Sequence, residues 1–203
     1  MGRAKKLLLA AGTLVLIGGG VFYYLNSKDH YDPSKYSATI TAPEINSQKS
    51  ASPIVERDAG APTAAAIGLA KGMRVELTLP DQFDVSHTIA PEIETLIFAF
   101  SKGAGATVRG FLDKEEENFL AQHKAIFIAD ISPIPVVIRN TLALPKLRKS
   151  SYPVMLIYEE EMAASLRNDA HEDQIAVVTI QSYVVQDIRY LADEAGLASI
   201  FSR

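Results

Sequence analysis

The stretch from Thr95 to Ser132, TLIFAFSKGAGATVRGFLDKEEENFLAQHKAIFIADIS, constrains the fold of this chain more than any other. Its first part, Thr95–Phe100, is a short apolar run of strand-forming residues, as expected for a strand buried on both faces. Two glycines in Lys102–Gly105 interrupt it, a helical pattern follows, and Ala125–Ile131 is a second strand of the buried type. A βαβ unit of this length joins parallel strands by a right-handed crossover. The stretch therefore predicts an α/β fold but indicates no reaction.

Cysteine is absent from the 203 residues, and the formal net charge is -4. The missing thiol excludes disulfides, thiolate catalysis, thiolate metal sites and acylation of a lipoprotein cysteine. Because the charge is nearly balanced and no dense basic patch occurs, we expect no nucleic-acid partner.

The N-terminus has the pattern of a membrane anchor. Residues 1–6 carry Arg3, Lys5 and Lys6, and residues 7–25 are uncharged and mostly apolar. At about 1.5 Å per residue, such a helix spans roughly 28 Å, close to the hydrocarbon core of a bilayer. The basic flank predicts a cytoplasmic N-terminus. The alternative is a cleaved signal peptide, but Phe22–Leu25 lacks the small residues of a cleavage site. We therefore expect a single-pass protein of a bacterial inner membrane with an extracytoplasmic, periplasmic C-terminal domain.

Residues 26–72 have the composition of a flexible linker. They contain Pro33, Pro43, Pro53 and Pro62, many small polar residues and no sustained apolar period. A flexible chain of this length reaches roughly 35–40 Å, which would hold a folded domain at residues 73–203 away from the membrane.

The domain begins with a predicted hairpin and ends with another. Met73–Leu79 alternates between apolar and polar residues, and Val85–Ile89 returns after a turn. After the βαβ unit, we expect the following elements: a helix at Val136–Leu144 that stops or bends near Pro145, a strand at Val154–Tyr158, a short helix and loop at Glu159–Asp173, paired strands at Ile175–Ile180 and Val184–Tyr190, and a helix at Ala192–Phe201. A tight hairpin joins only antiparallel strands, so the sheet is predicted to be mixed.

The segments LTLPDQFDVSHTI, ETLIFAFSK and AIFIADIS resemble, in this order, the entry of the thioredoxin-like fold. The resemblance is greatest to its membrane-tethered and peroxiredoxin-like branches, and it covers about Met73–Phe201. It implies a three-layer α/β/α domain with a mixed central sheet. Pro153 has two interpretations. Either it is similar to the family's cis-proline, with Glu159–Asp173 as an insertion, or it simply opens a strand and the final hairpin alone is the family's last pair.

The chain departs from this family where its chemistry resides. The resemblance places the two redox cysteines at, or within one residue of, Gly103 and Ala106. Neither residue can form a thiolate, so thiol–disulfide exchange and peroxide reduction by cysteine are excluded. The resemblance therefore implies a fold and a binding surface without the family's thiol chemistry.

The candidate binding residues are Lys102, Gly103, Ala104, Gly105, Arg109 and Pro153. A glycine-rich turn at a helix N-terminus presents free N–H groups and the positive end of a dipole, which would favour an anion beside Lys102 and Arg109. The alternative is a tight turn without a binding role. As a dinucleotide motif the stretch is incomplete, because Val108 stands where the third glycine belongs. We expect no catalytic residue, metal site or cofactor. The basic segment Lys146–Lys149 could contact anionic lipid or an acidic partner.

These observations predict a non-catalytic interaction or accessory module of a membrane or cell-envelope complex, whose partner is another membrane or periplasmic protein. The alternative is a binding protein or enzyme that uses Lys102–Arg109 for an anionic ligand or cofactor.

Overall fold

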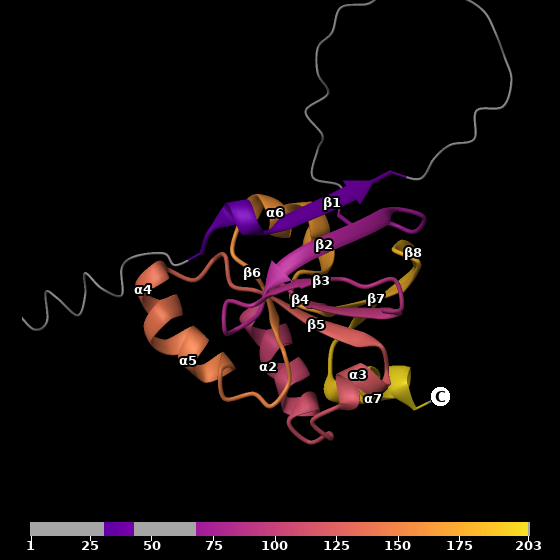
Figure 1. Cartoon of the computed structure of the whole chain (residues 1–203). Coiled ribbons are helices and arrows are strands. Elements are labelled where there is room, and N and C mark those ends of the chain that lie inside the picture. Colours follow the sequence, from indigo (N-terminus) through magenta and orange to yellow (C-terminus); the bar gives the residue numbers. More distant parts are fainter. Residues whose placement is uncertain (1–30, 43–67, 203) are drawn as a thin grey trace, which may run out of the picture.

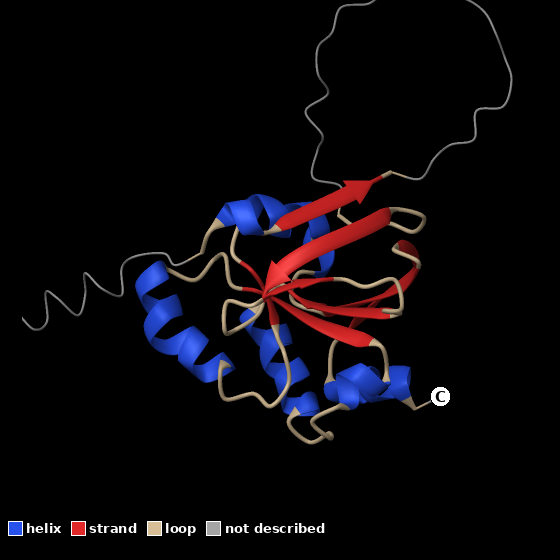
Figure 2. Cartoon of the chain, in the orientation of Figure 1, coloured by secondary structure: helices blue, strands red, loops and turns tan. Residues whose placement is uncertain are grey.

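The computed structural model describes residues 31–42 and 68–202, which form one mixed sheet with helices (Figures 1 and 2). The strand order is β1-β2-β8-β7-β4-β5-β6, with β3 paired to β2. The strands are β1 (Ser37–Thr41), β2 (Arg74–Pro80), β3 (Ser86–Thr88), β4 (Thr95–Ala99), β5 (Ala125–Asp130), β6 (Met155–Ile157), β7 (Ile175–Gln181) and β8 (Val184–Leu191). The helices are η1 (Pro33–Lys35), α2 (Lys102–Leu112), α3 (Phe119–Gln122), α4 (Val136–Ile138), η2 (Arg139–Ala143), α5 (Leu144–Leu147), α6 (Glu160–Leu166), η3 (Asp169–His171) and α7 (Glu194–Phe201).

The predicted βαβ unit is confirmed. Strands β4 and β5 are parallel, with Thr95 opposite Ala125, and α2 lies between them in the chain. The predicted glycine-rich turn is wrong in detail, because the helix already begins at Lys102. Ser101 is the N-cap, and its Oγ accepts a hydrogen bond from the Ala104 N–H at 3.2 Å. Gly103 and Gly105 thus lie in the first helical turn, and neither has positive φ.

The earlier helix start places Gly103 and Ala106, which the resemblance compares with the family's redox pair, inside the helix. The N-cap is Ser101, and Ala104, which donates to it, is buried. None of these residues contains sulfur.

The hairpin at the C-terminal end is also confirmed. Strands β7 and β8 are antiparallel to each other, and β7 is antiparallel to β4. Strands β7 and β8 and helix α7 form a ββα unit. Its strand β7 pairs with β4 of the βαβ unit, which gives the strand order β8-β7-β4-β5. Strand β6 pairs in parallel with β5 at the sheet edge and takes no part in this hairpin. Pro153 therefore opens a separate strand, and no peptide bond among the described residues is cis. The cis-proline interpretation is wrong.

Two apolar cores lie on the two faces of the sheet. On one face, helices α2, α3, α5 and α7 cover side chains such as Ile97 and Phe127. On the other, Leu96 and Phe98 pack with strand β2, with Ile89 and with α6. The second outer layer is thus largely strands, not helices as expected from a three-layer α/β/α domain. The reason is that β2 buries Val75, Leu77 and Leu79 on one side and crosses the sheet until Asp81 bridges Met155 of β6 (Figure 1).

Part of the predicted linker belongs to the sheet. Strand β1 pairs antiparallel with β2, from Ser37 opposite Thr78 to Thr41 opposite Arg74 (Figure 1). Before it, the Tyr31 ring stacks on Tyr36 and Tyr158 at centroid distances of 5.1 and 4.5 Å. The composition of this segment did not indicate a strand, because β1 gains its stability from pairing with β2, which is distant in the sequence.

The predicted anchor, residues 7–25, and linker residues 43–67 lie outside the described part of the chain. Within residues 31–42 and 68–202, no helix combines the length and apolar character needed to cross a bilayer.

The helix from Val136, which was predicted to stop or bend near Pro145, continues to Leu147 with an irregular turn before the proline. It does so through a π turn, in which the Leu144 N–H donates to the Arg139 carbonyl five residues earlier. Proline lacks an N–H and its ring clashes with the carbonyl four residues before it in a regular helix. The wider turn just before Pro145 relieves this conflict, and turns of this kind are frequent at functional sites.

Candidate functional site

A groove of about 430 Å³ lies at the carboxyl ends of β4 and β5, between α2 and the helix Val136–Leu147. Its floor is apolar and consists of Ala99, Phe127, Ala129 and Ile131. Ligand sites of open α/β sheets commonly lie outside the carboxyl ends of the strands. The volume falls within the range of about 300–1,000 Å³ typical of ligand pockets.

The two walls are helices that face each other across this floor. Helix α2 contributes Lys102, Gly105 and Arg109, which recur at helical spacing and so share one face. The opposite wall contributes Ile138, Leu142 and Lys146. The side chains of Ile138 and Leu142 are 45% and 64% exposed, and Leu142 belongs to the π turn. Large apolar side chains in contact with water beside a groove are typical of a binding surface.

Three of the four charged residues that line the groove are basic. Lys102 and Arg109 lie on α2 and Lys146 on α5. The Arg109 Nε donates to the Gly105 carbonyl at 3.2 Å, which holds this side chain along its own helix. A Cβ at position 105 would lie 3.9 Å from the Cβ of Ala99, which lines the groove. Glycine at this position therefore leaves space in the groove. The groove can therefore receive apolar groups in its centre and a negative charge at its rim.

Asp130 also borders the groove, but its carboxylate belongs to the other face of the sheet. Strand alternation places it with Ile128, which packs in the core under β2. Its Oδ1 accepts from the Ser132 N–H at 2.8 Å, whereas Oδ2 is buried without a hydrogen-bond partner. Burial raises the pKa of Asp130, while the hydrogen bonds from Ser132 lower it to a smaller extent. This carboxylate does not compete with a negative ligand in the groove.

The structure separates the six residues predicted to bind. Lys102, Gly105 and Arg109 line the groove, whereas Gly103 is exposed outside it and Ala104 is buried beneath α2. Pro153 lies elsewhere, in a second pocket. Sequence reasoning missed Ile138 and Leu142, whereas Lys146 belongs to the basic segment that was predicted to contact lipid or an acidic partner. The available signal for Ile138 and Leu142 was their spacing of four residues in a predicted helix.

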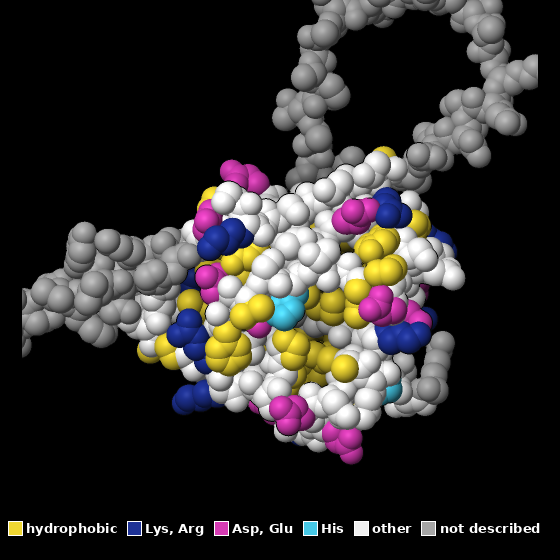
Figure 3. Space-filling model, in the orientation of Figure 1, with side chains coloured by type: hydrophobic (Ala, Val, Ile, Leu, Met, Phe, Trp, Pro, Cys, Tyr) yellow, Lys and Arg dark blue, Asp and Glu magenta, His cyan; other side chains and the backbone are white. Residues whose placement is uncertain are grey.

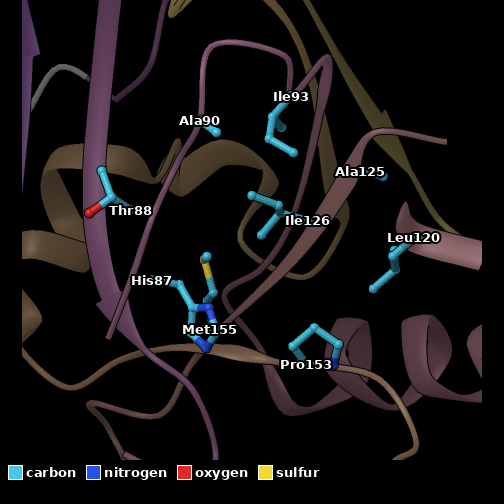
Figure 4. Close-up of a pocket in the computed structure, with 9 residues that line it drawn as sticks. All are labelled: His87, Thr88, Ala90, Ile93, Leu120, Ala125, Ile126, Pro153 and Met155. Atoms are coloured by element: carbon cyan, nitrogen blue, oxygen red, sulfur yellow. The ribbon is translucent and has the colours of Figure 1, made fainter. Parts of the chain in front are cut away.

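The second pocket, of about 200 Å³, is shown in Figure 4. Pro153, Met155 and Leu120 line it together with His87, whose Nε2 lies 2.9 Å from the Oδ2 of Asp81. Figure 3 shows hydrophobic side chains gathered around a histidine in a hollow of this face. One His–Asp pair on an apolar wall offers no nucleophile or second acid. Among the described residues, no three metal-ligating side chains come together either.

The connectivity defines the class of this protein. The βαβ unit followed by the ββα unit, with strand order β8-β7-β4-β5, gives it a thioredoxin-like α/β fold with a mixed sheet and without the redox cysteines. No family model matches the sequence, and no curated protein matches it.

Among the solved structures that resemble the chain are the following two. One is the solution structure of a proposed protein disulfide isomerase from Bacteroides thetaiotaomicron, with 18% identity and a TM-score of 0.42 over 62% of this chain and 80% of that chain. The other is the solution structure of a proposed thioredoxin from Neisseria meningitidis, with 12% identity and a TM-score of 0.42 over 63% of this chain and 86% of that chain. At these values the likeness says nothing of function, and the fold class rests on the strand order.

Proposed function

We propose that this protein is a membrane-anchored, extracytoplasmic thioredoxin-like domain that binds a segment of another membrane or periplasmic protein in the groove between α2 and the helix Val136–Leu147. Residues 7–25 would be the anchor, in a bacterial inner membrane. The observation that carries this proposal is the pair of exposed apolar side chains, Ile138 and Leu142, facing α2 across an apolar floor.

The chemistry of the groove specifies the partner segment. Apolar contact surface belongs at the centre of a protein–protein interface, and charged groups belong at its rim. Here the centre is apolar, and Lys102, Arg109 and Lys146 surround it. The complementary segment therefore presents two or three apolar side chains flanked by Asp or Glu. Because the chain contains no cysteine, it forms no mixed disulfide with this partner.

Photo-crosslinking in cells tests the proposal. A photoreactive residue at Lys102 or Leu142 samples the two walls, and one at Ala106, exposed on α2 outside the groove, is the matched control. We expect one dominant protein adduct from both walls and none from the control, read by mass spectrometry of isolated membranes. Equal labelling from all three positions, or none from a folded and exported chain, would contradict the proposal.

A second candidate uses the same groove for a small amphipathic anion. The three basic residues and the groove volume favour it. Thermal shift against medium-chain carboxylates, phosphorylated metabolites and nucleotides separates the candidates, since a ligand at 100 times its Kd adds about 2.7 kcal/mol of stability. A shift with one of these compounds that Lys146→Gln removes would favour the small ligand.

A further inference from the structure

We propose that the tip of the β2–β3 hairpin, residues 82–85, and the basic end of α5, residues 146–149, together form a surface that rests on anionic lipid headgroups. This inference rests on the anchor of the proposed function and adds an orientation to it. The domain would lie against the membrane with this surface, and would not be suspended at the end of a long linker.

The first argument is the length of chain between the predicted anchor and the folded domain. The anchor ends at residue 25, and Tyr31 is already stacked on Tyr36 and Tyr158. Six residues span at most about 20 Å when fully extended. The Tyr36 hydroxyl in turn donates to Oδ1 of Asp84, at the hairpin tip, at 2.6 Å. The chain thus enters the domain beside the hairpin tip, and so near the membrane.

The second argument is the exposed apolar surface of the tip. The side chains of Phe83 and Val85 are 56% and 53% exposed. Among the described residues, the other exposed large hydrophobic side chains are Ile138 and Leu142, which belong to the groove. Their backbone is held firmly, because both N–H groups donate to Oδ1 of the buried Asp81. A rigid loop that presents an aromatic and a branched aliphatic side chain is suited to insertion among headgroups.

The third argument is charge. The Arg148 Nε donates to the Gln82 carbonyl at 2.9 Å, so the basic end of α5 adjoins the tip. Arg148 and Lys149 are exposed, as is Lys146, which also lines the groove. Two nearby acids have partners within the domain: the exposed Asp84 accepts the Tyr36 hydroxyl, and the buried Asp81 pairs with His87. Each basic residue close to an anionic surface strengthens binding about fivefold. Positive charge beside apolar side chains matches an anionic bilayer.

The chain contains no tryptophan, so Phe83→Trp provides a single fluorescent reporter at the tip. The full chain is reconstituted in nanodiscs of phosphatidylcholine with or without phosphatidylglycerol, and bromolipids serve as quenchers. Ala195→Trp, exposed on α7, is the matched control. We expect a blue-shifted emission for Phe83→Trp that bromolipids quench, stronger with phosphatidylglycerol and weakened by Lys149→Gln or by about 0.5 M salt. We expect neither effect for Ala195→Trp.

The other outcomes overturn the inference. No shift at position 83, or equal quenching at both positions, would show that the tip does not face lipid. A blue shift without bromolipid quenching would show that a protein surface covers it. Failure of the anchor is seen separately, as a chain that does not enter nanodiscs, and the tip is then tested with added vesicles of the same lipids. Failure of partner binding in the groove would be detected only by the photo-crosslinking experiment on the proposed function.

Discussion

The side-chain amide of Gln82 joins the β2–β3 hairpin to the segment before β6. Its Oε1 accepts a hydrogen bond from the Val154 N–H at 2.8 Å, and its Nε2 donates to the Tyr152 carbonyl at 2.9 Å. Gln82 is buried, so water cannot replace its amide as the hydrogen-bond partner of these two backbone groups. A single side chain thus performs the pairing that a strand would otherwise provide where the sheet closes from β2 to β6.

Gln82→Ala should therefore destabilise the domain strongly. It leaves a buried N–H and a buried carbonyl without partners, at about 1–3 kcal/mol for each. We expect the free energy of unfolding in urea to fall by roughly 2–6 kcal/mol. Gln181→Ala, at an exposed position on β7, should change it by less than about 0.5 kcal/mol. A loss at position 82 no larger than this control would mean that the bridge contributes little.

Position 105 offers a way to close the groove without disturbing the fold. Gly105 lies in a helix with ordinary φ and with space for a Cβ, so Gly105→Ala should stabilise the domain by about 0.5–1 kcal/mol in urea unfolding. Gly105→Leu should keep the fold but fill the groove and abolish crosslinking from Leu142. Gly103→Leu, outside the groove, should leave crosslinking intact. Equal crosslinking in both leucine variants would exclude the groove as the docking site.

Asp130 should make the stability of the domain depend on pH. Its pKa is raised in the folded state by burial, so between the pKa of an unfolded aspartate, about 3.9, and the raised value the folded state binds more protons. The free energy of unfolding therefore falls as pH rises through this window. Asp130→Asn should flatten this fall and increase stability at pH 7, measured by urea unfolding between about pH 3.5 and 7. Asp173→Asn, on an exposed loop, is the control. An unchanged slope in Asp130→Asn would contradict the assignment.

The Tyr36 hydroxyl should hold β1 and the chain entry against the hairpin tip. Tyr36→Phe removes its 2.6 Å hydrogen bond to the Asp84 carboxylate and retains the ring stacking. Hydrogen bonds to charged groups contribute about 1.5–3 kcal/mol. We expect amide hydrogens of Ser37–Thr41 to exchange roughly tenfold faster or more, with little change in β4 and β5. Uniform acceleration over the whole sheet would indicate global destabilisation instead.

Local patterns were sufficient for the main elements of residues 73–203 and for the fold class. The apolar runs at β4 and β5 and the helical period between them predicted the parallel pair, because burial on both faces leaves a continuous apolar run and a parallel connection requires a crossover. The alternation of Val75, Leu77 and Leu79 predicted a strand with one buried side. The absence of cysteine excluded the family's thiol chemistry from composition alone.

Only the tertiary structure decided what these elements do together. The sequence around Ser37–Thr41 is polar and proline-flanked, and it becomes a strand because the free edge of β2 satisfies its backbone hydrogen bonds. The groove needs Gly105 and Leu142 on two helices that pack against the same strands, and no local pattern records such a pairing. Local periodicity states which side of an element is apolar. What covers that side, and what stays open to a partner, depends on contacts between residues far apart in the chain.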